Sequence, residues 1–258
     1  MHACIPFTIK GHVAVITMSN APANTWTHDS LDSLADLILD FNQDKNIYSL
    51  VITGAGEKFF SAGADLKLFA DGDQQTAVLM ATAFGRAFEA LSQFRGLSIA
   101  AINGYAMGGG LEVALACDLR IAESQAQMAL PEAAVGLLPC AGGTQNLAWL
   151  VGEGWAKRMI LCGERVSAQQ ALDIGLVEAV VESGQALKQA LLWAQKSEQQ
   201  SPTSVAACKR LIQNARSHPM MAGMACERDE FVNLFNSNDQ KEGVRAFLEK
   251  RQPQWTNS

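Results

Sequence analysis

Apolar and polar residues alternate at the start of the chain and then change to helical spacing. Residues 7–18, FTIKGHVAVITM, are rich in Val, Ile and Thr, and Gly11 interrupts them, so we expect a hairpin or paired strands. Between residues 27 and 41, apolar side chains recur every three or four positions, which predicts a helix with Thr27 as its N-cap. The chain therefore opens with a strand–strand–helix unit.

Strand and helix patterns then alternate through the first two-thirds of the chain. Short apolar runs predict buried strands at residues 48–54, 97–102, 118–124 and 175–181. Helical spacing and capping residues predict helices at residues 74–94, 109–117, 143–151, 154–162 and 167–174. The last third is predicted to be helical, with one helix starting at Ser201-Pro202 and another at Asp239 and Glu242. Alternating strands and helices are typical of the α/β class.

The composition is that of a globular protein, and its charge limits the possible partners. The 258 residues are enough to bury a substantial core, and hydrophobic residues make up 48% of them. A net charge of −6 argues against binding to nucleic acid or to an anionic membrane. No apolar run is long enough to span a membrane, and residues 1–11 lack the features of a signal peptide. We therefore expect a cytoplasmic protein.

The sequence carries no signal for a nucleotide cofactor or a metal. No G-x-G-x-x-G follows the first strand, and TGAGEKFF, residues 53–60, is neither that motif nor a Walker A loop. The six cysteines include no C-x-x-C pair, and the four histidines show no zinc-ligand spacing. We expect free thiols in a reducing compartment, no metal site, and no nucleotide-dependent hydride or phosphoryl transfer.

Two glycine-containing turns are candidates for binding an anion. In NGYAMGGGLEVAL, residues 103–115, three glycines open a predicted helix whose first N–H groups have no partner within the helix. A tight strand-to-helix crossing explains this segment equally well. A second turn, FFSAGADLKLF at residues 59–69, also follows a strand and presents amides around Gly63 and Ala64. Two such turns can converge on one oxygen atom that becomes negatively charged during a reaction.

Two glutamates occupy apolar segments beside these glycine- and proline-rich turns. Glu112 lies in the first turn of a predicted apolar helix, and Glu132 follows Pro131 within MALPEAAVGLLP. A charge is costly in such surroundings, so a raised pKa or local solvation is expected. Each glutamate alone could be a helix-capping or salt-bridge residue. Together they are typical of a pair that acts on one water molecule or one substrate proton.

Around these residues the chain resembles the crotonase (enoyl-CoA hydratase/isomerase) superfamily over nearly its whole length. The resemblance rests on SAGADLK (61–67), AAINGYAMGGGLEVALACDLRIA (100–122), LPEAAVGLLPCAGGTQNL (130–147), VSAQQALDIGLVEAVV (166–181) and KEGVRAFLEKRQPQW (241–255). It implies an α/β fold in which repeated ββα units form a crotonase-type spiral, followed by C-terminal helices used for trimerisation. We expect residues 1–195 to form the spiral core domain and residues 196–258 the helical oligomerisation region, in a homotrimer or a hexamer built as a dimer of trimers.

The resemblance also implies a site for a coenzyme A thioester. The amides of Ala64 and Gly109 would form an oxyanion hole for the thioester carbonyl. Coenzyme A is then part of the substrate, and no separate cofactor is expected. Residues that match positions contacting the substrate or CoA are Ala62, Ala64, Asp65, Leu66, Lys67 and Gly109, with Phe247 and Lys250 from the same or a neighbouring subunit.

The two glutamates favour an enoyl-CoA hydratase, a hydro-lyase, within this superfamily. Glu112 would deprotonate a water molecule, and Glu132 would deliver a proton to the α-carbon of a trans-2-enoyl-CoA, giving a 3-hydroxyacyl-CoA. The alternatives are an enoyl-CoA delta-isomerase that uses Glu132 alone, another acyl-CoA enzyme of the superfamily, or a non-catalytic acyl-CoA-binding or RNA-binding relative. The acyl-chain length stays open, as does the pathway, whether β-oxidation of fatty acids or degradation of amino acids or aromatic acids.

Three positions depart from the pattern of the superfamily. Cys140 replaces a glycine of the PGAGGTQRL string, and Asn146 replaces its arginine, which is expected to alter a surface or interface contact. Trp26 stands where a smaller aliphatic residue is common, and this predicts an altered acyl pocket.

Overall fold

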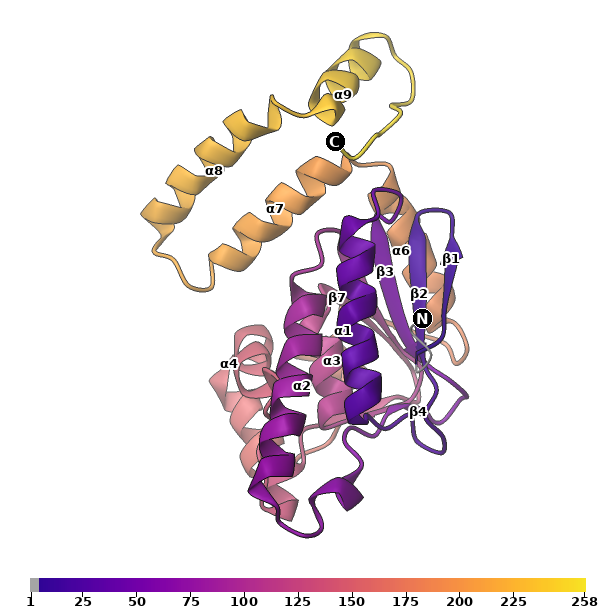
Figure 1. Ribbon diagram of the computed structural model, residues 1–258, viewed down its shortest axis with the longest axis vertical. Coiled ribbons are helices and arrows are strands. Elements are labelled where there is room, and N and C mark those ends of the chain that lie inside the picture. Colours follow the sequence, from indigo (N-terminus) through magenta and orange to yellow (C-terminus); the bar gives the residue numbers. More distant parts are fainter. Residues whose placement is uncertain (1–4) are drawn as a thin grey trace.

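The computed structural model describes residues 5–258 (Figure 1). These residues include a sheet of six strands. The strand order is β1-β2-β3-β5-β7-β10, and every neighbouring pair is parallel except the β1–β2 hairpin. The predicted hairpin is therefore confirmed. The strands of this sheet are β1 (Phe7–Lys10), β2 (Val13–Met18), β3 (Ser49–Gly54), β5 (Leu97–Ile102), β7 (Leu119–Glu123) and β10 (Ala179–Val181).

A second, smaller sheet gives the fold its repeating character. It comprises β4 (Phe59–Ser61), β6 (Tyr105–Met107), β8 (Gln127–Ala129) and β9 (Val166–Ser167), in that order. Along the chain, β3, β5 and β7 of the large sheet are each followed by one strand of the small sheet, and then by the helices α2, α3 and α4. Three ββα units thus stack side by side, so the expected spiral of repeated ββα units is confirmed.

Helices cover both faces of the large sheet because side chains alternate across each strand. On β2, Ala14 and Ile16 pack beneath α1 and α2, whereas Val13 and Val15 pack against α6 on the other face. Thr27 caps α1 as predicted, since its hydroxyl accepts from the Ser30 amide. The helices of the core are α1 (His28–Gln43), α2 (Gln74–Ser92), α3 (Gly109–Ala116), α4 (Gly143–Leu161), α5 (Ala168–Asp173) and α6 (Ala186–Glu198), with 3₁₀ helices η1 (Leu66–Phe69) and η2 (Glu132–Val135).

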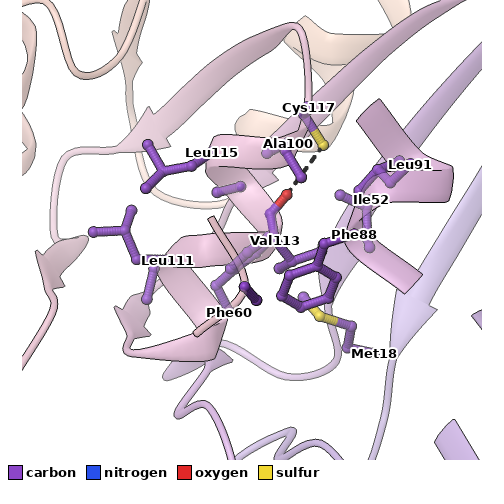
Figure 2. Packing of buried hydrophobic residues seen from close by; sticks show 14 of the residues in the cluster. Met18, Ile52, Phe60, Phe88, Leu91, Ala100, Leu111, Val113, Leu115 and Cys117 are labelled. Atoms are coloured by element: carbon purple, nitrogen blue, oxygen red, sulfur yellow. Dashed lines mark hydrogen bonds between the residues drawn. The ribbon is translucent and has the colours of Figure 1, made fainter. Parts of the chain in front are cut away.

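The helix α3 lies at the centre of this core. All of its residues are buried, because apart from Glu112 it is apolar on every side and is enclosed by the sheet, α2 and α4. In Figure 2, Val113 lies towards Phe60 and Phe88, and the thiol of Cys117 donates to the carbonyl oxygen of Val113 at 3.5 Å. Burying this helix carries the carboxylate of Glu112 into the interior, where it is only 3% exposed.

Three further helices extend beyond the core and make up most of the predicted C-terminal region (Figure 1). They are α7 (Pro202–Asn214), α8 (Met220–Leu234) and α9 (Asn238–Leu248). Lys209 on α7 forms a 2.8 Å ion pair with Asp118, which ties this region to the core. No residue of α8 is buried. The large exposed apolar residues of α8, α9 and the turn between them are Met220, Met221, Met224, Phe231, Val232, Phe235, Val244, Phe247 and Leu248, which together we call the C-terminal apolar patch.

Some boundaries differ from those predicted, for local reasons. The strand expected at 175–181 is confined to β10, because Gly175 adopts a φ of +79° and the amide of Leu176 bonds back to Ala171. The two helices expected between residues 143 and 162 are the halves of α4, which is interrupted at Gly152. The helix α9 begins after Ser237, whose hydroxyl caps it, rather than at Asp239.

Residues 5–258 show neither a membrane-spanning helix nor a metal-binding cluster. None of the helices in this part of the chain is long and apolar enough to cross a membrane. No three His, Cys, Asp or Glu side chains of these residues lie together in a way that would hold a metal ion. The cysteines at positions 117, 140, 162, 208 and 226 are free thiols, whereas His2 and Cys4 lie outside the described residues.

Candidate active site

A cavity of about 610 Å³ lies where the glycine-rich turns meet the two glutamates. The loop after β4, the start of α3, one side of α2 and the segment from η2 to Cys140 form its walls. Six of the predicted site residues line this cavity: Ala62, Ala64, Leu66, Gly109, Glu112 and Glu132. The fold therefore brings residues from three distant parts of the sequence together around one space.

The two predicted amide-donating turns are in direct contact. A Cβ atom built on Gly63 would lie only 3.0 Å from the nitrogen of Gly109. Gly109 is the first residue of α3, so its N–H has no partner within the helix. Among the described residues, no hydrogen bond uses the N–H of Ala64, and a parallel β-bridge to Trp26 fixes the position of Ala64. The geometry leaves two backbone donors at one wall of the cavity.

Glu112 is held by backbone donors from another turn. Its Oε1 accepts hydrogen bonds from the amides of Ala141 at 2.8 Å and Gly143 at 2.9 Å. Gly143 is the first residue of α4, and the positive end of a helix dipole favours a nearby negative charge. Burial raises the pKa of Glu112 above its ordinary value, and the two amide hydrogen bonds oppose that rise. The two amides therefore offset part of the cost of ionising Glu112 in the interior.

Glu132 has the opposite environment. It begins η2, and neither of its carboxyl oxygens, both of which are buried, has a hydrogen-bond partner in the described chain. A Cβ atom on Gly108 would lie 3.1 Å from Oε1 of Glu132, so this carboxyl group sits against the glycines that open α3. Burial raises the pKa of Glu132 to about 7, and the charge of Glu112 contributes to the rise. Near neutral pH the Glu132 carboxyl group can therefore carry a proton.

Four predicted CoA-contacting residues do not line this cavity. Asp65 instead caps η1, where its carboxylate accepts from the amide of Lys67 at 3.1 Å. Phe247 is 83% exposed on α9, and Lys250 follows that helix in the C-terminal region. The single chain therefore does not bring Phe247 or Lys250 to the cavity, and their expected role depends on a neighbouring subunit.

The positions that depart from the superfamily pattern have distinct surroundings. Trp26 is 2% exposed and does not line the cavity; it packs against Phe88 behind the wall, and its buried indole N–H has no hydrogen-bond partner among residues 5–258. Cys140 does line the cavity, and burial raises the pKa of its thiol to about 11. Asn146 accepts a hydrogen bond from Arg216, which is the kind of surface contact expected for that position. Any effect of Trp26 on the acyl pocket is therefore indirect.

Sequence reasoning missed the residues that hold Glu112 and those that form the apolar wall. The amides of Ala141 and Gly143 belong to the CAGGTQ string, and its glycines at a predicted helix start are the signal in the sequence that points to them. Met80 and Phe84, on α2, line the cavity, but helical spacing alone does not distinguish a cavity wall from a packed core.

Replacing Gly143 with Ala is expected to lower catalytic turnover by about tenfold or more while acyl-CoA binding changes little. The added Cβ would lie 2.8 Å from Oε1 of Glu112 and 2.8 Å from the Cβ of Pro139, so the carboxylate must move. The control is Gly154→Ala in the same helix, where a Cβ meets nothing within 4 Å. Steady-state kinetics of both variants test this, and equal turnover in the two would contradict it.

Comparison with known proteins identifies the family. The enoyl-CoA hydratase/isomerase family model matches residues 8–258. The chain is 38% identical over 251 residues to the short-chain-enoyl-CoA hydratase of Clostridium acetobutylicum, covering 94% of this chain and 93% of that protein. It is 41% identical over 210 residues to the 2,3-dehydroadipyl-CoA hydratase of Escherichia coli, covering 81% of each.

Solved structures of proteins with similar sequences have the same fold as this chain. DspI of Pseudomonas aeruginosa is 63% identical, with a TM-score of 0.95 over 98% of this chain and 96% of that one. An enoyl-CoA hydratase from Bacillus anthracis is 35% identical, with a TM-score of 0.94 over 99% of this chain and 100% of that one. The matched fold, the shared sequence and the glutamate-lined cavity lead to one conclusion: the chain belongs to the enoyl-CoA hydratase/isomerase family of enzymes, the crotonase family.

Proposed function

We propose that this protein is an enoyl-CoA hydratase, which adds water across the 2,3 double bond of a trans-2-enoyl-CoA to give a 3-hydroxyacyl-CoA. The observation that carries the proposal is the contrast between two carboxyl groups lining one apolar cavity. Glu112 accepts hydrogen bonds from two amides, which oppose the rise that burial causes in its pKa, whereas Glu132 has no such donor among the described residues and its pKa is raised to about 7. A base and an acid in the same cavity are what the addition of water requires.

The amides of Ala64 and Gly109 are proposed to bind the thioester carbonyl oxygen. Hydrogen bonds to this oxygen withdraw electrons from the conjugated double bond, so the β-carbon becomes electrophilic. They also stabilise the enolate-like charge that develops in the transition state, and one such donor typically contributes about 3 kcal/mol. Because Gly109 begins α3, the dipole of that helix acts in the same direction.

The two glutamates are proposed to divide the proton transfers between them. Glu112 removes a proton from water while the water oxygen bonds to the β-carbon. Glu132 gives its proton to the α-carbon, so one proton enters the pair and one leaves it. Since interacting carboxyl groups share their titration, the active form is the pair that carries a single proton.

Product analysis with two substrates tests the proposed function. A hydratase converts a trans-2-enoyl-CoA to the 3-hydroxyacyl-CoA, whereas an isomerase only interconverts 3-enoyl-CoA and 2-enoyl-CoA. In heavy water, hydration places deuterium on the α-carbon, and a protein that only binds acyl-CoA incorporates none. Isomerisation without any 3-hydroxyacyl-CoA would refute the hydratase assignment.

The pH dependence of hydration follows from the proposed protonation states. Glu132 must hold a proton, and its pKa is about 7, so kcat/KM should fall about tenfold per pH unit above that value. Towards low pH, activity should fall again as Glu112 gains a proton, from a pKa that burial raises. Steady-state kinetics between pH 4 and 10 measure both limbs. A profile that stays flat from pH 7 to 10 would contradict the role of Glu132.

The C-terminal apolar patch supports the proposal that the protein assembles as a homotrimer or as a hexamer. Exposed apolar surface of this extent is typical of a subunit interface. We expect Phe231→Glu, on α8, to dissociate the assembly, and Leu39→Glu, on the exposed side of α1, to leave it intact. Light scattering coupled to size-exclusion chromatography measures the mass. A wild-type monomer, or an unchanged mass for the Phe231 variant, would contradict this prediction.

Within such an assembly, Phe247 and Lys250 of one subunit are proposed to contact the CoA of another. We further propose that CoA enters only as part of the substrate and that no metal or separate cofactor takes part. The free thiols and the net charge of −6 support a cytoplasmic protein that binds neither nucleic acid nor membranes.

A further inference from the structure

The walls of the cavity are almost entirely hydrocarbon. They are built from the side chains of Ala, Val, Leu, Met, Phe and Pro, together with the glycines of the two turns and Gly136 after η2. Among the described residues that line it, only Glu112, Glu132 and Cys140 carry a polar side chain. No lining residue of this part of the chain is a lysine, arginine or histidine, and none carries a hydroxyl or amide side chain.

Any charge that the described lining side chains carry is therefore negative. Glu112 supplies a negative charge in its ionised form, and the amides that solvate that charge are already used. The free backbone donors at Ala64 and Gly109 are assigned to the thioester oxygen. Lys67 follows the lining residue Leu66 in the sequence, but Lys67 itself does not line the cavity and belongs to the loop assigned to CoA.

Such a cavity distinguishes between acyl chains by their charge. A buried methylene contributes about 0.8 kcal/mol of binding, which corresponds to about fourfold in kcat/KM. A carboxylate at the far end of the acyl chain would enter a space with no cation to pair with it, and Glu112 would repel it. Desolvating an unpaired ion costs far more than a methylene contributes.

We propose that the acyl group of the substrate is an uncharged hydrocarbon chain, and that this site rejects 2-enoyl thioesters whose acyl chain ends in a carboxylate. The proposal rests on the hydratase function and adds the class of substrate to it. The selectivity comes from the absence of a cation among the lining residues that the structure describes and from the charge on Glu112.

Three substrates of the same chain length test the proposal by turnover. They are trans-2-hexenoyl-CoA, trans-2,3-dehydroadipyl-CoA and the ω-methyl ester of the latter. The dicarboxylic substrate should have a kcat/KM lower than that of hexenoyl-CoA by about a hundredfold or more. The neutral ester should stay within about tenfold of hexenoyl-CoA. Dehydroadipyl-CoA turning over within tenfold of hexenoyl-CoA would overturn the proposal, and so would an ester as poor as the acid, because size would then explain the discrimination.

Binding of saturated analogues separates this proposal from the proposed function. Dissociation constants for hexanoyl-CoA and adipoyl-CoA are measured by titration calorimetry, without any reaction, and adipoyl-CoA should bind more weakly by about a hundredfold. If no substrate is hydrated but hexanoyl-CoA still binds more tightly than adipoyl-CoA, the proposed hydratase function is refuted, whereas the proposed preference for hydrocarbon acyl chains is supported. If hexenoyl-CoA is hydrated but hexanoyl-CoA and adipoyl-CoA bind equally, the hydratase function is supported, whereas the proposed preference for hydrocarbon acyl chains is refuted.

Discussion

Replacing Glu112 with Gln is expected to lower the kcat for hydration by about a hundredfold or more. The carboxamide oxygen can still accept from the amides of Ala141 and Gly143, so the surrounding structure is retained. The carboxamide cannot take a proton from water at neutral pH, however, so the nucleophile is not activated. Hydration of trans-2-hexenoyl-CoA is the measurement.

A second buried glutamate provides the matched control for this variant. Glu123 is 4% exposed and accepts from the amide of Ala186, but it does not line the cavity. Glu123→Gln should therefore leave kcat within about threefold of the wild type. An isomerase that uses Glu132 alone would keep its conversion of 3-enoyl-CoA to 2-enoyl-CoA in Glu112→Gln. Full hydration activity in that variant would refute the role of Glu112.

Replacing Glu132 with Gln should also reduce hydration by about a hundredfold or more, for a different reason. The carboxamide is a neutral group of similar size that fills the same pocket but has no acidic proton to deliver to the α-carbon. Deuterium incorporation at the α-carbon should be lost with turnover, while hexanoyl-CoA binding persists. Unchanged turnover would contradict the assignment.

Stability gives a second measurement for the same residue. Burial raises the pKa of Glu132 to about 7, so the folded protein binds this proton more tightly than the unfolded chain does. The free energy of unfolding of the wild type should therefore decrease as the pH rises from about 4.5 to 7, relative to that of Glu132→Gln. Urea denaturation of both proteins at pH 5 and pH 8 compares them. A difference between the two proteins that does not change with pH would show that Glu132 titrates normally.

Much of the fold was predictable because its local signals agree with one another. Residues 27–41 combine helical spacing with a capping threonine, and the structure has α1 there with Thr27 as its cap. The placement of Glu112 inside an apolar helix was equally informative, since α3 had to be buried whatever enclosed it. The segments that follow the parallel strands meet at one end of the sheet, and this brought the two predicted turns together.

The rest depends on contacts between distant segments. Ala141 and Gly143 hold Glu112 across about 30 residues of chain, and neither has a side chain that marks such a role. The difference in environment between Glu112 and Glu132 likewise arises from where the amides of Ala141 and Gly143 lie, which the spacing of residues in the sequence does not reveal. Trp26 was expected to alter the acyl pocket, but whether a large residue lines a wall or lies behind it is decided by packing.

The exposed helix α8 has a consequence for the energetics of the whole molecule. A helix with no buried residue gains little from tertiary packing, and isolated helices of about 15 residues are marginal in water. In the proposed assembly, association would bury the apolar residues of α8, so folding of this segment and subunit association would be one thermodynamic event. Mass action then applies, and the apparent melting temperature would rise with protein concentration.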